Sequence, residues 1–209
     1  MGRECRFWEI YMVRRGRFPP RLAGLNFKVD LLSSTQTKEL DGLITAIAES
    51  KKRLPSSVET LDLSGGCMRE EPLISLAFAG FFRRGGSGSS DGKLSHLKAL
   101  ILSGCGIDDS LLARWGEVFR AHVCPKMTFL NLSRNRISIA GLSAFFDALR
   151  PESLPALMSI PLYGQKGVNG NKQENQFYTA VQKLRNKVRF QQKLPGLKDI
   201  VLNGDRLVQ

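Results

Sequence analysis

Apolar residues recur at one fixed spacing in six segments of the chain. Each segment spans eleven residues, with apolar side chains at positions 1, 4, 6 and 11 and a small or polar residue at position 9. The segments begin at Leu22, Val58, Leu97, Met127, Leu157 and Leu197. Side chains alternate between the two faces of a strand, so positions 4 and 6 predict a short strand with one buried face. We expect six parallel strands, beginning near Ala23, Glu59, Lys98, Thr128, Met158 and Lys198.

Helical periodicity fills the intervals between these segments. Successive segments start 36, 39, 30, 30 and 40 residues apart, which leaves room for a helix in each interval. Apolar residues spaced i, i+3, i+4 and i+7 predict amphipathic helices. They lie within residues 40–48, 73–81, 112–119, 142–149 and 177–188. We expect Ser138 to cap the fourth of these helices, and either Asp108 or Asp109 to cap the third.

The residue at position 9 falls where the chain turns away from the strand. Asn135 and Cys105 suit this place, because their side chains can bond backbone groups that would otherwise be buried without partners. Asp30 and Asp205 suit it less well, because a buried carboxylate is costly unless it is paired. In the fifth segment we expect the pattern to break down at Gln165.

The spacing resembles the leucine-rich repeat, whose pattern is L-x-x-L-x-L-x-x-N/C-x-L. Long repeats with a full helix resemble the ribonuclease-inhibitor type of that family. The resemblance covers roughly residues 22–209 and implies an α/β solenoid of about six repeats. Short parallel strands would line its concave face and α-helices its convex face. Residues 1–21 would form an N-terminal cap with a basic arm, and residues 84–93 a flexible insertion rich in Gly and Ser.

Cysteine usage and hydropathy bear on the compartment. The four cysteines show no CxxC spacing, which favours free thiols in an intracellular, reducing compartment. No run of residues reaches the roughly 18 apolar side chains of a membrane-spanning helix. Residues 1–21 carry Glu4 and Glu9 and lack an apolar run, so we expect no secretory signal. The mitochondrial matrix and the cytoplasm both stay open, because the Arg-rich start favours the first and the two Glu oppose it.

Positive charge is concentrated in two blocks. Residues 1–22 hold six Arg and two Glu, and residues 166–198 hold eight basic side chains and one acidic. Together they account for eleven of the twelve net positive charges. This distribution is typical of a surface that binds RNA or another polyanion, although a solvated basic helix face would look the same. The predicted RNA contacts are Arg14, Arg15, Arg17, Lys183, Arg185, Lys187, Arg189 and Lys193.

Residues for catalysis, metal binding or cofactor binding do not converge in the sequence. His122 stands beside Cys124 at the end of a predicted helix, but no third group is placed to orient such a pair. Metal binding needs three or four convergent ligands, and none cluster here. The Gly-rich stretch 85–93 follows a predicted helix and ends in Lys93-Leu94, which departs from a phosphate-binding loop. We therefore expect a non-enzymatic protein without a cofactor.

The outward positions of the predicted strands carry several apolar side chains. A contiguous exposed group of this kind is a candidate interface, and in leucine-rich-repeat proteins the concave sheet is the usual protein-binding surface. The predicted protein contacts are Ile101, Phe129, Asn131, Met158, Pro161 and Tyr163.

The sequence therefore predicts a scaffold that docks into a larger assembly. The charge blocks favour a ribonucleoprotein component, such as part of a mitochondrial or other ribosome. RNA would bind the N-terminal arm and residues 166–198, and a protein neighbour would bind the sheet. The alternative is a protein-binding adaptor or regulatory subunit, cytoskeletal or signalling, that makes no RNA contact.

Overall fold

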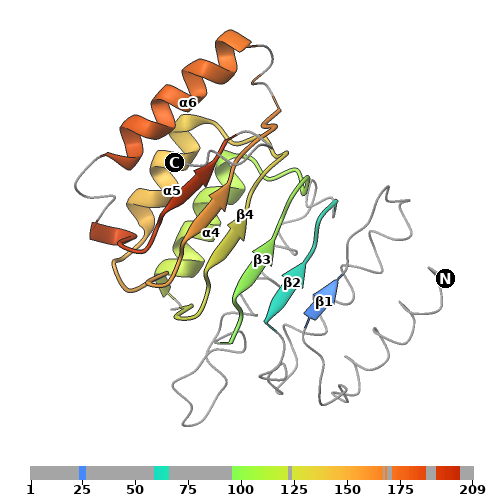
Figure 1. Cartoon of the computed structure of the whole chain (residues 1–209), viewed down its shortest axis with the longest axis vertical. Helices are drawn as coiled ribbons and strands as arrows, with labels where there is room; N and C mark the ends of the chain where they lie inside the picture. The colour runs from blue at the N-terminus through green and yellow to red at the C-terminus, as the bar shows by residue number, and fades with distance from the viewer. Residues whose placement is uncertain are drawn as a thin grey trace, which may run out of the picture.

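Six short strands form one parallel sheet, in which each strand lies beside the next one in sequence (Figure 1). The computed structural model describes residues 24–26, 59–65, 96–121, 124–166, 168, 171–186 and 192–202. The strands are β1 (Gly24–Asn26), β2 (Thr60–Asp62), β3 (Ala99–Ile101), β4 (Phe129–Asn131), β5 (Ser159–Pro161) and β6 (Asp199–Val201). Each begins one residue after its predicted start and every neighbouring pair is parallel, so the predicted sheet is confirmed.

The register aligns equivalent positions of successive repeats. Leu61 pairs with Leu100, and Leu100 pairs with Leu130. All three position-4 side chains are buried, whereas the residues on either side of them in β2, β3 and β4 are half-buried. The alternation predicted from the apolar spacing is therefore present in these strands.

Three helices follow the last three inter-strand turns of the described chain: α4 (Asp109–Ala121), α5 (Ile139–Ala148) and α6 (Asn171–Arg185). In Figure 1, α4 and α5 lie behind the sheet, on one side of it. The Asp108 carboxylate accepts a hydrogen bond from the Leu111 amide at 2.9 Å, so Asp108 is the cap of α4. This bond, ahead of the Ser110 bonds, lowers the pKa of Asp108 below its ordinary value against the opposing effect of burial.

Ser138 caps α5, as predicted, because its hydroxyl accepts a hydrogen bond from the Gly141 amide at 3.3 Å. The helices predicted within residues 40–48 and 73–81 lie outside the described residues, as do the arm at 1–21 and the insertion at 84–93. Those predictions stay untested.

The core lies between the sheet and the helices. Phe119 of α4 contacts Phe145 of α5 in an edge-on arrangement, with ring centroids 6.2 Å apart. The two helices also approach closely at Gly116, where an added Cβ would lie 2.9 Å from the Cβ of Ala148. Small residues at this contact allow the backbones of α4 and α5 to come together.

Side chains at position 9 bind successive turns to one another. The Asn135 amide nitrogen donates to the carbonyl oxygens of Leu102, Leu132 and Ser133, at 2.9, 2.9 and 3.1 Å. The Asn135 side-chain oxygen accepts from the Ile107 amide at 3.1 Å. One repeat earlier, the Cys105 thiol donates to the Leu63 carbonyl at 3.1 Å. The roles predicted for Asn135 and Cys105 are confirmed.

Gln165 continues this row, contrary to the expectation that the fifth repeat breaks down there. Its amide nitrogen donates to the carbonyls of Leu132 and Leu162, at 2.9 and 3.0 Å. Its side-chain oxygen accepts from the Ile137 amide at 3.0 Å. A Gln side chain, one methylene longer than Asn, therefore makes the same kind of bridge between turns.

Candidate functional site

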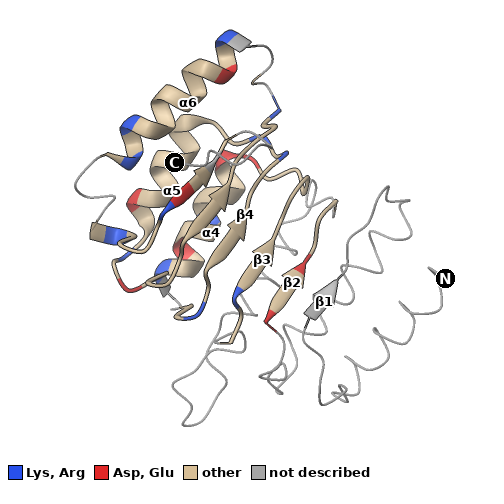
Figure 2. Cartoon of the chain, in the orientation of Figure 1, with Lys and Arg blue, Asp and Glu red and all other residues tan. Residues whose placement is uncertain are grey.

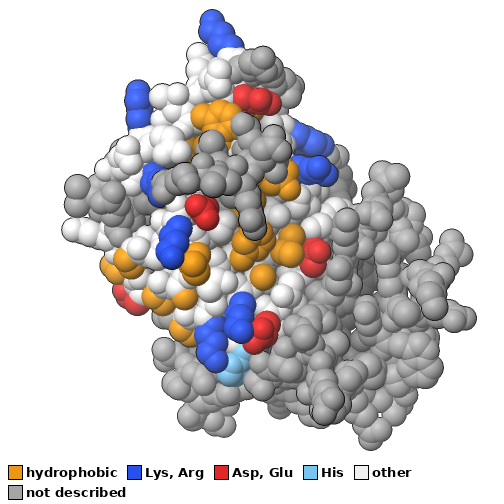
Figure 3. Space-filling model, in the orientation of Figure 1, with side chains coloured by type: hydrophobic (Ala, Val, Ile, Leu, Met, Phe, Trp, Pro, Cys, Tyr) orange, Lys and Arg blue, Asp and Glu red, His pale blue; other side chains and the backbone are white. Residues whose placement is uncertain are grey.

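The strand face is the surface formed by the outward side chains of β3, β4 and β5, on the side of the sheet away from α4 and α5. These three strands contain no charged residue. Ile101 and Phe129 are half-buried apolar residues on neighbouring strands; Phe129 pairs with Ala99 on one side and with Ser159 on the other. Figure 3 shows hydrophobic side chains gathered over the middle of this face. Ile101 and Phe129 therefore lie diagonally to each other on two paired strands, and their part in protein binding stays a prediction.

Asn131 and Asp62 occupy equivalent positions at the ends of β4 and β2. The Asn131 side-chain oxygen accepts hydrogen bonds from the Ser133 amide and hydroxyl, at 3.0 and 2.7 Å. The Asp62 carboxylate makes the same pair of bonds with Ser64, at 2.9 and 2.6 Å. Both polar groups are therefore held in one orientation before any partner binds.

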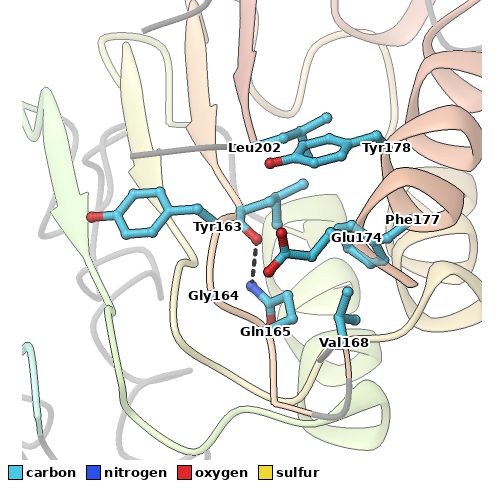
Figure 4. Close-up of a pocket in the computed structure, with 9 residues that line it drawn as sticks. Tyr163, Gly164, Gln165, Val168, Glu174, Phe177, Tyr178 and Leu202 are labelled. Carbon is cyan, nitrogen blue, oxygen red and sulfur yellow. Dashed lines mark hydrogen bonds between the residues drawn. The ribbon is translucent and has the colours of Figure 1, made fainter. Parts of the chain in front are cut away.

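The other three residues predicted to bind protein differ in exposure. Met158, just before β5, is 40% exposed. Tyr163 is half-buried, and its ring points away from the other labelled side chains in Figure 4. Pro161 is buried, which departs from the outward exposure expected of it. It therefore offers little surface in the structure, although its neighbours do.

The basic residues predicted to bind RNA fall into three groups. Lys183, on α6, is exposed. Arg185 donates to the Lys198 carbonyl at 2.8 Å, and the Lys193 ammonium donates to the carbonyls of Phe146 and Asp147 at the end of α5, at 3.1 and 2.5 Å. Both side chains therefore make structural contacts, and Lys193 also places a cation at a helix C-terminus, which is stabilising. Arg14, Arg15, Arg17, Lys187 and Arg189 lie outside the described residues.

A second group of cations was not predicted. Arg134, Arg136 and Lys166 are exposed on the turns that follow β4 and β5, where Figure 2 shows basic positions beyond the arrowheads of the strands. We call these three residues the basic edge. A sequence signal existed, because Arg134 and Arg136 flank Asn135, and the neighbours of a buried position 9 are free to point outward.

A small pocket of about 190 Å³ lies between the turn after β5 and the first turns of α6. Figure 4 shows Glu174 and Tyr178 from α6 facing Gln165 and Leu202 across it. Burial raises the pKa of Tyr178 above its ordinary value, and the nearby Glu174 carboxylate adds to this. Gln165 is already bonded to the backbone on both sides, so the pocket has few polar groups left for a ligand.

The described part of the chain offers little support for a reactive thiol or a metal site. Cys105 and Cys124 are both buried thiols. Burial raises the pKa of the Cys124 thiol to about 12, which keeps it protonated and unreactive. Among the described residues, no three His, Cys, Asp or Glu side chains gather as metal ligands. The described helices include none that is long and apolar enough to cross a membrane.

Comparison with known proteins bears on the family. A family model described as Leucine Rich repeat matches residues 93–110 and 123–146, which fall in the third and fourth repeats. No curated protein matches the chain. The solved structures that resemble it include Leiomodin-1 Actin-Binding Site 2, with 14% identity over 94% of this chain and 78% of that one and a TM-score of 0.43.

A second solved structure is the tropomodulin C-terminal domain of Caenorhabditis elegans. Its identity is 13% over 97% of this chain and 84% of that one, with a TM-score of 0.38. The family match coincides with the strands and position-9 bonds of the two repeats that fit the pattern best. The recurrent spacing, the parallel sheet and this match together identify the fold as an α/β leucine-rich-repeat solenoid, with residues 93–110 and 123–146 in two of its repeats.

Proposed function

We propose that this protein is a non-enzymatic adaptor that binds a partner protein on its strand face. The observation that carries the proposal is the position of Ile101 and Phe129, two half-buried apolar side chains that lie diagonally to each other on the paired strands β3 and β4. Apolar surface of this kind favours association, because water leaves it when a partner binds. The adaptor function, given by the sequence as the alternative, therefore has better support than the ribonucleoprotein function.

The polar residues around these side chains suit the same function. Asp62 and Asn131 are each fixed by a serine two residues later. A surface whose groups are already ordered loses less conformational entropy on binding. The row of position-9 bonds behind the strands adds to this rigidity.

Site-specific photo-crosslinking tests the proposal. The full chain would carry p-benzoylphenylalanine at Phe129 or, as a matched control, at Ala144, which is exposed on α5. We expect Phe129 to crosslink one discrete protein that Ala144 does not, and we expect Ile101→Asp to abolish that crosslink. Equal crosslinking from both positions, or no effect of Ile101→Asp, would contradict the adaptor function.

RNA binding is the second candidate function, favoured by the excess of basic residues in 166–198. Within that segment, Lys172 and Lys183 are exposed on α6, whereas Arg185 and Lys193 are bonded to carbonyl groups of the chain. Charge is thus the one support for a ribosomal or other ribonucleoprotein role. Affinity purification at two salt concentrations separates the two functions, because phosphate contacts weaken steeply with salt.

A further inference from the structure

The three cations of the basic edge are held together by the backbone. Asn135 is fully buried, so Arg134 and Arg136 on either side of it project outward. The Lys166 amide donates to the Asn135 carbonyl at 2.6 Å, which brings Lys166 beside both arginines. Arg134 has a φ of 56°, so the turn fixes it in the left-handed conformation. The cluster therefore follows from the turn geometry and does not depend on chance placement of long side chains.

The two carboxylates at the start of α4, Asp108 and Asp109, are engaged in hydrogen bonds. Asp108 lies opposite Arg136 in an isolated bridge, but its carboxylate accepts hydrogen bonds from the Leu111 amide and the Ser110 hydroxyl. Asp109 is bonded to the amide and hydroxyl of Ser138. Across the described ranges, no ion pair joins the basic edge to a carboxylate.

The charges are paired at the other end of the strands, where β2 and β3 begin. There Lys98 forms a salt bridge of 2.7 Å with Glu59. The basic edge therefore has a net positive charge that is not neutralised by the described residues, and anionic groups of a partner can complement it.

The basic edge adjoins the strand face. The Tyr163 carbonyl accepts a hydrogen bond from the Arg134 amide at 2.7 Å, so Tyr163 lies between the two. β4 ends at Asn131, three residues before Arg134. At about 3.3 Å per residue, an extended partner segment of a few residues reaches from Phe129 to the basic edge.

We propose that the partner binds through an acidic protein segment, with an apolar side chain on Ile101 and Phe129 and adjacent Asp or Glu side chains on the basic edge. This inference rests on the adaptor function and specifies its ligand. Arginine suits the contact, because its guanidinium group can hold a carboxylate through two parallel hydrogen bonds. The partner is thus recognised by charge and by apolar contact together.

Charges on the sheet favour a protein segment over a nucleic acid. β3, β4 and β5 are uncharged, but the strands on either side contain Asp62 and Asp199. A nucleic-acid strand has a phosphate at every nucleotide and would bring negative charge near these carboxylates. A peptide can restrict its carboxylates to the basic edge and place neutral residues over the sheet.

Binding of defined polymers to the full chain tests this inference by fluorescence anisotropy. The probes are a random copolymer of Glu and Tyr, polyglutamate and polyuridylate. The test variant is Arg134→Glu with Arg136→Glu. The matched control, Lys126→Glu with Arg150→Glu, makes the same charge change at exposed residues that precede β4 and β5. We expect the copolymer to bind more tightly than polyglutamate, and the test variant to weaken its binding by at least about tenfold, or ~1.4 kcal/mol, with little change in the control.

Each other outcome has a definite reading. Equal losses in the test variant and the control would overturn the inference, while an intact Phe129 crosslink would still support the adaptor function. Tighter binding of polyuridylate than of the copolymer, lost in the test variant, would mean that the edge binds phosphate and would also overturn it. Thermal unfolding checks that the variants fold. Arg134→Gln with Arg136→Gln is the milder pair, expected to weaken copolymer binding in the same direction.

Discussion

The carboxylate of Asp109, in the first turn of α4, accepts hydrogen bonds from both the amide and the hydroxyl of Ser138, at 2.7 and 2.5 Å. Ser138 is the cap of α5, so the start of one helix is fixed by the helix of the preceding repeat. A negative charge at a helix N-terminus is stabilising in itself. Gly141 lies against the same carboxylate, and a Cβ added there would overlap it. These three residues form one junction between repeats.

Gly141→Ala should lower the free energy of unfolding by roughly 1–3 kcal/mol, because the new methyl group overlaps the Asp109 carboxylate. This loss is expected although Ala favours a helix more than Gly does. Urea unfolding measures it. In an Asp109→Ala background the same substitution should cost less, since the two nearest overlapping atoms are gone. An equal loss of stability with and without the Asp109 carboxylate would show that Gly141 and Asp109 do not contact each other in this way.

Asn135→Ala should cost about 3 kcal/mol, because the Ile107 amide and the Leu102 carbonyl lose the side-chain partner that satisfies them in the core. Gln165→Ala should be nearly as destabilising, because the Ile137 amide and the Leu162 carbonyl lose theirs. Cys105→Ala should cost only about 1 kcal/mol, because a thiol is a weak donor. Chemical denaturation of the three variants checks this order, and a larger loss for Cys105→Ala would contradict it.

The free energy of unfolding should decrease as the pH rises above the ordinary pKa of a cysteine thiol. The Cys124 thiol has a pKa of about 12 in the folded protein and about 8.5 in an unfolded chain. Between these values the unfolded state has lost a proton that the folded state keeps. The free energy of unfolding therefore decreases by up to about 1.4 kcal/mol per pH unit.

Cys124→Ala should flatten this decrease when parent and variant are unfolded in urea between about pH 8 and 9.5. Tyr178, whose pKa is also raised, titrates mainly above that window. Iodoacetamide supplies an independent check, because Cys124 should be alkylated only after unfolding. Rapid labelling of Cys124 in the folded protein would show that its site is open.

Lys183→Gln and Lys193→Gln should differ in their effect on stability. Lys183 is exposed, so its loss should leave the melting temperature unchanged and, if RNA binds α6, lower the salt slope of binding by about 0.7. Lys193 caps α5, so its loss should lower stability by about 0.3–1 kcal/mol. Circular dichroism melts and RNA titrations at several salt concentrations distinguish the two. Equal melting temperatures would place Lys193 outside the cap.

Local spacing predicted much of this architecture. The six strands and the caps at Asp108 and Ser138 depend on residues close together in sequence, which the apolar period places directly. The sequence pattern placed Gln165 correctly at position 9 of the fifth repeat. The error was to expect that a Gln side chain could not make the hydrogen bonds that Asn makes there. Cys105, Asn135 and Gln165 follow one another at intervals of 30 residues, and that interval could have indicated a shared role.

Contacts distant in sequence were harder to predict. The periodicity of α6 places Arg185 on the helix but does not reveal that the side chain reaches the Lys198 carbonyl. Lys193 likewise bonds to carbonyls of α5 more than forty residues earlier. Strand alternation directs Pro161 outward without telling which neighbours cover it, and the structure has it buried. Sequence patterns thus locate a side chain on its own helix or strand, whereas its hydrogen bonds and its burial depend on how the elements pack together.

The close approach of α4 and α5 at Gly116 and Ala148 has a consequence for the opposite side of the molecule. Neighbouring strands lie about 4.8 Å apart, whereas packed helices usually need about 8–10 Å. The difference between the two spacings bends the sheet. Small residues between the helices reduce this difference and therefore reduce the curvature of the sheet. The curvature around Phe129 is therefore set partly by residues that no partner on the sheet would touch. A bulkier side chain at Gly116 would push the two helices apart and increase the curvature of the sheet to which the proposed partner would bind.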